Sequence, residues 1–229
     1  MIGKLSLKYY VESILTLISG SNFYKFPLLF LKKPILVNLA NGLNFYVNDF
    51  MQIWVLKETI LDNDYQKFWR IKNGDVVVDI GASIGDFSVL ANKAGAQVFS
   101  FEKDESLSKL LRENLVINNC KNINYNIEEV KSLKNIFIKS NIKKCDFLKI
   151  DCEGCEYALL LKTDKTTFKK IKYIAMEAHL FNREMKMNFQ KMISKLENNL
   201  FKVRIVENPV HDYLKFVFAE RIIVINEQI

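Results

Sequence analysis

Residues 73–225 alternate between short apolar, β-branched runs and amphipathic segments. This pattern is typical of a parallel sheet covered by helices on both faces, because such strands are buried on both sides. The runs predict seven strands, at residues 76–80, 98–101, 123–127, 147–150, 173–176, 201–206 and 221–225. We therefore expect an α/β protein with a seven-stranded, mostly parallel sheet.

Two helices between these strands are marked by apolar residues at helical spacing. The first follows Asp104, which is suited to cap a helix N-terminus. Its apolar face consists of Leu107, Leu110, Leu111 and Leu115. The second has the same spacing at Phe189, Met192, Ile193 and Leu196.

Residues 1–70 have a different pattern and predict an N-terminal extension to a domain at residues 71–229. Near the start, Leu5, Tyr9, Leu15 and Ile18 predict a helix with one apolar face. Docking of that face on the rest of the protein is the simpler interpretation, and peripheral contact with a membrane is the alternative.

Further along the extension, two alternating runs at residues 35–39 and 43–47 flank Asn41-Gly42. This arrangement predicts a β-hairpin, because both turn residues tolerate a positive φ. Residues 49–68 then predict a helix.

Composition narrows the classes of function. The net charge is +7, but the lysines are scattered in pairs such as Lys32-Lys33 and Lys143-Lys144. A basic solvated surface is therefore favoured over a nucleic-acid partner, which stays open. The longest apolar stretches, residues 13–18 and 27–31, are far shorter than the ~20 residues that span a bilayer. Without a signal-peptide arrangement, the sequence predicts a cytoplasmic protein.

The four cysteines are too few and too irregularly placed for a secreted disulfide framework. Cys152 and Cys155 form C-x-x-C, which is compatible with a zinc or redox site. Zinc needs four ligands, and only His179 and His211 are available elsewhere. We therefore expect small buried cysteine side chains and no metal.

The first predicted strand runs into a loop of small residues that is suited to bind a nucleotide-like ligand. Gly81 and Gly85 enclose Ala82 and Ser83, and a helix containing Phe87 follows. The small loop lets a ligand approach the backbone and the free N–H groups of that helix. Ser83 stands where dinucleotide binders have their second glycine, and the acidic Asp79 suits a cationic sulfonium better than a pyrophosphate.

Acidic residues also end two further strands. Glu102 lies 21 residues after Gly81, beside Lys103, where a carboxylate accepts the hydroxyls of an adenosine ribose. Asp151 and Glu153 follow the strand at residues 147–150. Because the carboxyl ends of parallel strands face the ligand crevice, both are candidate site residues, although Glu153 is also suited to cap the next helix.

Four motifs together resemble a known family. Residues 77–85, Phe101-Glu102, residues 148–154 and residues 175–179 are similar, in this order, to the motifs of FkbM-type methyltransferases. The likeness extends over residues 34–225. It implies a Rossmann-like class I methyltransferase fold with S-adenosylmethionine as cofactor, and O-methylation of a sugar, glycolipid or natural-product-like small molecule.

The resemblance also implies roles for individual residues. Asp79, Gly81 and Gly85 would line the methionine part of the cofactor, Glu102 would hold the ribose, and Asp151 would lie near the methyl group. Ser83 departs from the Asn that is usual in the family. We expect Asn126 and Ile127 to form the side of the site that contacts the adenine, the adenine wall.

His179, after the fifth strand, is the candidate general base, because its ordinary pKa of ~6.5 suits proton abstraction near neutrality. A purely hydrogen-bonding histidine is the alternative, and Asp151 or Glu153 remain candidates for the base or for orienting the acceptor. The rival functions are an RNA methyltransferase, a nicotinamide-dependent oxidoreductase and an inactive scaffold. Asp151-Cys152-Glu153-Gly154 does not resemble the motif of base N-methyltransferases, which disfavours nucleic acid.

Overall fold

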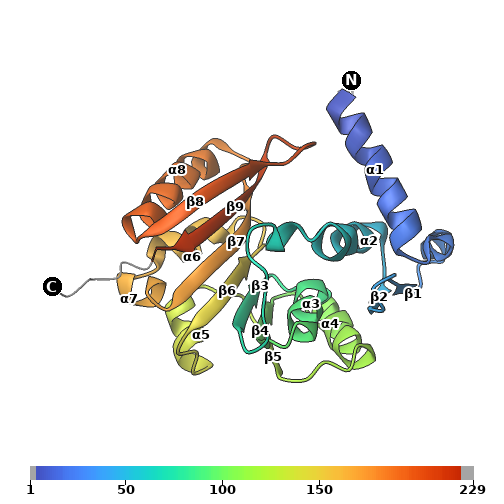
Figure 1. Cartoon of the computed structure of the whole chain (residues 1–229), viewed down its shortest axis with the longest axis horizontal. Helices are drawn as coiled ribbons and strands as arrows, with labels where there is room; N and C mark the ends of the chain where they lie inside the picture. The colour runs from blue at the N-terminus through green and yellow to red at the C-terminus, as the bar shows by residue number, and fades with distance from the viewer. Residues whose placement is uncertain (1–3, 223–229) are drawn as a thin grey trace. The chain divides into compact units, whose positions relative to one another are not determined.

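The computed structural model describes residues 4–222 and confirms the α/β prediction (Figure 1). Its internal contacts divide the chain into two compact units. The first unit is Met1–Asp75 with Asp79–Glu129, and the second is Val76–Val78 with Val130–Ile229.

The first unit contains the N-terminal extension and the glycine loop. Its helices are α1 (Lys4–Gly20), η1 (Phe23–Leu31), α2 (Phe50–Leu56), η2 (Lys57–Leu61), η3 (Asp64–Gln66), α3 (Asp86–Lys93) and α4 (Glu105–Ile117). Its strands are β1 (Ile35–Asn38), β2 (Asn44–Val47), β4 (Gln97–Glu102) and β5 (Ile123–Ile127). Strand β3 (Val76–Ile80) begins in the second unit and ends in the first.

The second unit contains the later strands and helices of the chain. Its helices are α5 (Leu133–Lys139), α6 (Cys155–Lys162), α7 (Lys165–Phe168) and α8 (Arg183–Asn198). Its strands are β6 (Cys145–Ile150), β7 (Ile171–His179), β8 (Phe201–Glu207) and β9 (Leu214–Arg221).

Strands β3 to β9 form one seven-stranded sheet in the order β5-β4-β3-β6-β7-β9-β8. The pairs β4–β5 and β6–β7 are parallel, whereas β9 runs antiparallel to both β7 and β8. Six of the predicted strands are confirmed with small shifts at their ends. The mostly parallel sheet is confirmed with them.

The prediction of the last strand was wrong. It placed a strand at residues 221–225, but β9 ends at Arg221, and residues 223–225 lie outside the described part. The β-branched run at residues 222–225 misled the prediction. The position of this strand is set by its pairing with neighbouring strands. β9 lies in register with β7 on one side and β8 on the other, and this pairing buries Val217, Phe218 and Ala219.

The hairpin of the extension is confirmed, with Ile35 opposite Val47. Only Gly42 uses a positive φ, of 86°. Asn41 contributes differently: its side-chain oxygen accepts a hydrogen bond from the Leu43 backbone N–H at 3.1 Å. The turn therefore combines one glycine with one side-chain cap.

The single helix predicted at residues 49–68 is interrupted. Asp49 caps α2 by accepting from the Gln52 N–H at 2.8 Å, but the helix continues as the π-helical η2 and then ends. Asn63 has a φ of 60° and separates η2 from η3. Its left-handed backbone is the physical reason for the break.

The extension packs on α4 and the glycine loop through one apolar core. Val37 and Phe45 of the hairpin share this core with Leu111 of α4 and with Ala82 and Ile84 of the loop. The open edge of β2 is closed by side chains of α4. Asn114 exchanges two hydrogen bonds with the Tyr46 backbone, at 2.7 and 3.2 Å, and donates a third to the Ile84 carbonyl at 2.9 Å.

Candidate functional site

The glycine loop between β3 and α3 adopts a left-handed backbone at three positions, with φ of 75° at Gly81, 49° at Ser83 and 86° at Gly85. Glycine takes this conformation at little cost, but Ser83 does not. A Cβ on Gly85 would also lie 3.1 Å from Leu111 Cγ. The loop is held to the end of β4, because Gly81 N–H and Ala82 N–H both donate to the Phe101 carbonyl, at 3.0 and 3.1 Å.

Glu102 lies at the end of β4 and is joined to this loop. Its Oε2 accepts from the Ser83 N–H at 2.8 Å, and its Oε1 accepts from the Asp104 N–H at 2.9 Å. The residue is only 7% exposed. Two backbone donors therefore fix the carboxylate, and each oxygen keeps a second acceptor site for a ligand hydroxyl. The structure thus brings together the two motifs that the sequence predicted separately.

Asp79 and Phe87 lie inside the first unit. The Asp79 side chain is fully buried, and it accepts from Ser88 Oγ on α3 at 2.7 Å. Ser88 Oγ lies 2.6 Å from Ser100 Oγ, so the three polar groups tie β3, α3 and β4 together. The Phe87 ring packs edge-on against Tyr65 at 5.6 Å. Both residues support the loop structurally, and their contact with a cofactor stays a prediction.

The expected adenine wall lies beside Glu102 in the sheet. Asn126 pairs with Phe101, and Ile127 pairs with Glu102. The Ile127 side chain is 46% exposed at this end of the sheet, and Lys103 is exposed as well. An exposed aliphatic side chain next to a fixed carboxylate suits a nucleoside, which has an apolar base and a hydroxylated sugar.

The acidic loop of the second unit follows β6. Asp151 Oδ2 lies 3.8 Å from the ammonium of Lys149, a side chain that is almost fully buried in the sheet. Glu153 is exposed and has a φ of 55°, and Gly154 has a φ of 108°. Glu153 therefore makes the turn into α6 together with Gly154.

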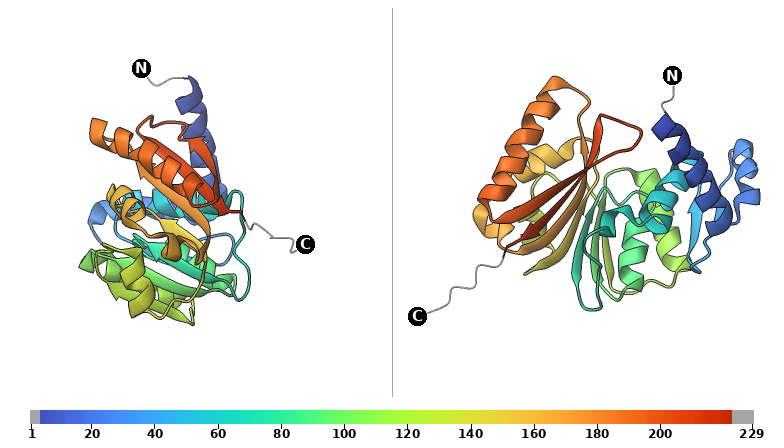
Figure 2. Two further views of the ribbon diagram at one scale, coloured as in Figure 1. Left: turned by 90° about the vertical axis from the view of Figure 1, so that its left-hand side faces the viewer. Right: turned by 45° about the horizontal axis from the view of Figure 1, so that its top comes forward.

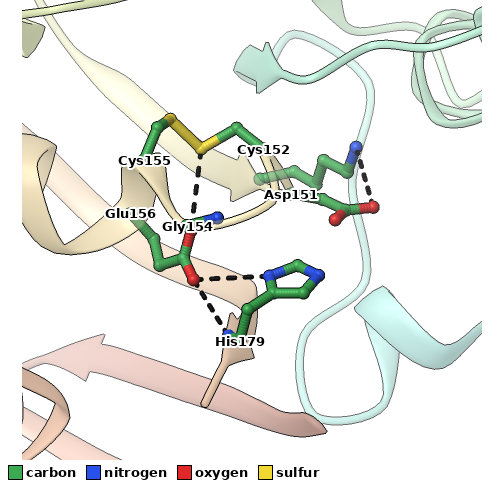
Figure 3. The surroundings of a disulfide bond; sticks show 7 residues. Asp151, Cys152, Gly154, Cys155, Glu156 and His179 are labelled. Atoms are coloured by element: carbon green, nitrogen blue, oxygen red, sulfur yellow. Dashed lines mark hydrogen bonds and ion pairs between the residues drawn. A yellow bond between two sulfur atoms is a disulfide. The ribbon is translucent and has the colours of Figure 1, made fainter. Parts of the chain in front are cut away.

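Glu156 organises this loop, a role that was not predicted from the sequence. Figure 3 shows its carboxylate between the loop and His179. Its Oε1 accepts from the His179 N–H at 2.9 Å and lies 3.3 Å from His179 Nδ1, while its Oε2 accepts from the Gly154 N–H at 2.8 Å. The carboxylate is fully buried. The available signal was its place in the first turn of α6, two residues after the glycine.

His179, at the end of β7, lies between two carboxylates. Its Nδ1 faces Glu156, and its Nε2 is 3.7 Å from Glu177 Oε1. Burial lowers the pKa of His179, but the hydrogen bond and charge of Glu156, with the charges of Asp151 and Glu177, outweigh burial and raise the pKa above 6.5. The imidazole is therefore oriented by one carboxylate and is a stronger base than a free histidine.

The expectation for Cys152 and Cys155 was wrong. The two residues form a disulfide across the acidic loop, with Cα atoms 5.4 Å apart (Figure 3). Both are partly exposed, whereas Cys145 is buried as a small apolar side chain. The turn at Glu153-Gly154 brings the two sulfurs together, a consequence that composition alone does not reveal.

A groove of 320 Å³ between α6 and α8 opens beside Gly154.

Comparisons with known proteins agree with this geometry. Residues 121–203 match the family model of the methyltransferase FkbM domain. This match supports the resemblance of the segment to the FkbM methyltransferase domain. The matched segment includes Asp151, Glu153, Glu156 and His179, whereas the glycine loop and Glu102 precede it. No curated protein sequence matches the chain.

Solved structures place the fold of the chain among class I methyltransferases. A Streptococcus mutans protein described as a methyltransferase, in complex with SAH, has 14% identity and a TM-score of 0.57, covering 71% of this chain and 96% of its own. An rRNA methylase from Streptococcus thermophilus has 11% identity, a TM-score of 0.53 and coverages of 75% and 94%. A precorrin-6y C5,15-methyltransferase from Geobacter metallireducens has 16% identity, a TM-score of 0.50 and coverages of 66% and 82%.

These relatives are named for different acceptors, one for rRNA and one for precorrin-6y. The sequence motif disfavoured nucleic acid as an acceptor. Likeness to these structures does not support that expectation. Within residues 4–222, no helix is both long and apolar enough to cross a membrane.

Proposed function

We propose that the chain transfers a methyl group from S-adenosylmethionine to a hydroxyl oxygen of a small molecule, such as a sugar or glycolipid. One observation carries the cofactor assignment: Glu102 is fixed by two backbone N–H groups beside the left-handed glycine loop. This donor set fits the cofactor, because a carboxylate with remaining acceptor sites suits a ribose diol and a small loop admits the amino-acid part.

The residues of the first unit would hold the cofactor. Glu102 would accept the ribose hydroxyls, Ile127 and Asn126 would contact the adenine, and the loop backbone from Gly81 to Gly85 would line the methionine part. Ala82, Phe87 and Asp79 would keep the loop in place, with Lys103 at its rim. When bound, S-adenosylmethionine supplies a methyl group on a positively charged sulfur.

The residues of the second unit would prepare the acceptor. His179 Nε2 would accept the proton of the acceptor hydroxyl, since Nδ1 is held by Glu156. Glu156 and Glu177 would stabilise the imidazolium that results. Asp151 would orient the acceptor near the methyl group, and the exposed Glu153 would contact more distant parts of it. Alignment of the reactants would supply much of the acceleration.

The test is methyl transfer from labelled S-adenosylmethionine to a panel of sugars, glycolipids and RNA. We expect label in a sugar or glycolipid, as an ether. Label in RNA alone would replace the small-molecule acceptor by nucleic acid. The net charge of +7 would be consistent with such a result. The affinity of the chain for RNA should then fall steeply as the salt concentration rises. Binding of NADH without any response to the sulfonium cofactor would overturn the proposal in favour of an oxidoreductase.

A further inference from the structure

Helix α1 has a packed face and a separate exposed apolar face, not the single apolar face that the sequence predicted. One face packs within the first unit: Tyr9 Oη donates to Glu58 at 3.0 Å, Ser13 is buried, and a Cβ on Gly20 would lie 2.8 Å from Leu61. The predicted residues Leu15 and Ile18 do not lie on this face, and they are exposed by 59% and 44%.

The second face of α1 is a continuous exposed stripe. It consists of Leu7, Val11, Ile14, Leu15 and Ile18. A helix turns by about 100° per residue, so these side chains span an arc of about 100° on the side opposite Tyr9, Ser13 and Gly20. No packing within the described unit explains a stripe of this kind.

The exposed apolar character continues onto η1 and the start of α2. Phe30 and Leu31 of η1 are 77% and 67% exposed, and Tyr24 and Met51 are similarly exposed. The Phe30 ring lies 5.2 Å from that of Phe50, which joins η1 to α2. We call these exposed side chains of α1, η1 and α2 the N-terminal apolar surface. Figure 2 shows α1 and η1, in blue, on the outside of their unit.

The charges around this surface are mostly positive. Residues 1–51, which include the exposed start of α2, contain five lysines and two carboxylates, Glu12 and Asp49, which gives +3 of the chain's +7. Glu12 is itself 3.7 Å from Lys8. Lys32 and Lys33 directly follow the most exposed part of η1. An apolar surface bordered by lysines complements a layer that is negatively charged outside and apolar beneath.

We propose that the N-terminal apolar surface binds a bilayer that contains anionic lipids, with α1 and η1 lying in the plane of the interface. The lysines contact the lipid headgroups, while Phe30, Leu31 and the α1 stripe enter the acyl boundary. A second copy of the chain is disfavoured as the occupant, because it would bring the same positive charge to the contact. RNA is disfavoured because it leaves the aliphatic side chains uncovered.

The experiment is co-sedimentation of the full chain with vesicles of phosphatidylcholine alone or of equal parts phosphatidylcholine and phosphatidylglycerol. We expect sedimentation with the anionic vesicles only. Phe30→Ser with Leu31→Ser removes two inserted side chains, and Lys32→Glu with Lys33→Glu reverses two charges. Each pair should weaken binding by on the order of tenfold or more. The matched control is Val116→Ser with Ile138→Ser, which changes exposed side chains of α4 and α5, 76% and 67% exposed.

The proposal is overturned if the wild-type chain stays in solution with anionic vesicles, or if the Phe30/Leu31 variant sediments as strongly as the control. Light scattering that shows a dimer broken by Phe30→Ser and Leu31→Ser, without vesicle binding, would assign the surface to a second copy. Retention on RNA that depends on Lys32 and Lys33, without vesicle binding, would assign it to nucleic acid. Circular dichroism verifies that each variant is folded. None of these measurements depends on methyl transfer, so they test this proposal separately from the proposed function.

Discussion

The two units position their candidate site residues in different ways. In the first, backbone N–H groups position the loop and the Glu102 carboxylate, through Gly81, Ala82 and Ser83. In the second, side chains do so, through the buried Glu156 and His179 and the partly exposed Cys152–Cys155 disulfide. A backbone site depends on small residues and positive φ angles, whereas a side-chain site depends on long-range contacts. The two should respond differently to substitution.

The largest expected effect is on chemistry in the second unit. His179→Ala should lower kcat by roughly 100-fold to 10,000-fold, because it removes the general base. Affinity for S-adenosylhomocysteine, measured by calorimetry, should change little, because the proposed cofactor residues lie in the first unit. His211→Ala is the control. Unchanged turnover of the true acceptor by His179→Ala would remove His179 from the role of base.

The next effect is on the stability of the first unit. Asn114→Ala leaves two partly buried backbone groups of Tyr46 and the buried carbonyl of Ile84 without their hydrogen bonds. We expect the free energy of unfolding to fall by roughly 2–4 kcal/mol. Because the Ile84 carbonyl belongs to the glycine loop, cofactor affinity should fall as well.

Denaturant unfolding and calorimetry check this prediction, with the exposed Asn135→Ala on α5 as the control. A loss of stability no larger than that of the control would show that the Asn114 contacts do not hold the hairpin to the loop.

These contacts also mark what the sequence predicted and what it did not. The six confirmed strands and the glycine loop follow from local composition, because buried strands and left-handed turns restrict the residues that fit them. The roles of Asn114, Glu156 and Glu177 could not be predicted, since each depends on a partner elsewhere in the chain. The same reason explains why the position of β9 was missed, whereas the disulfide depends on the left-handed turn at Glu153-Gly154, which composition does not reveal.

Loss of the Cys152–Cys155 disulfide should have a smaller effect than the Asn114 substitution. Reduction, or Cys155→Ser, opens a loop of four residues and should lower the free energy of unfolding by about 2 kcal/mol or less. It should lower turnover more than cofactor affinity, since the disulfide spans the acidic loop. Thermal melts and calorimetry with and without a dithiol reductant measure both, and Cys120→Ser is the control. A larger loss of cofactor affinity than of turnover would contradict this division of roles.

The smallest expected effect is a shift in the pH dependence. His179 acts as a base only when neutral, and its pKa is raised chiefly by Glu156 against the effect of burial. The rate should therefore rise with pH through a value above 6.5. Glu156→Gln removes the charge and should move this rise to lower pH. For the same reason, the contribution of protonated His179 to stability is full below its unfolded pKa and is lost as pH rises through the folded one. An unmoved profile would show that Glu156 only supports the fold.

The central claim is that Glu102, fixed by backbone N–H groups beside the glycine loop, holds the ribose of a sulfur nucleoside. Calorimetric titration with S-adenosylhomocysteine tests it most directly, on the wild-type chain, on Glu102→Ala and on the exposed control Glu113→Gln. We predict binding by the wild type and the control, and affinity weaker by roughly 10-fold to 100-fold in Glu102→Ala, since hydrogen bonds to a charged group are lost. Absence of binding by the wild type, or equal affinity in all three, would contradict the account.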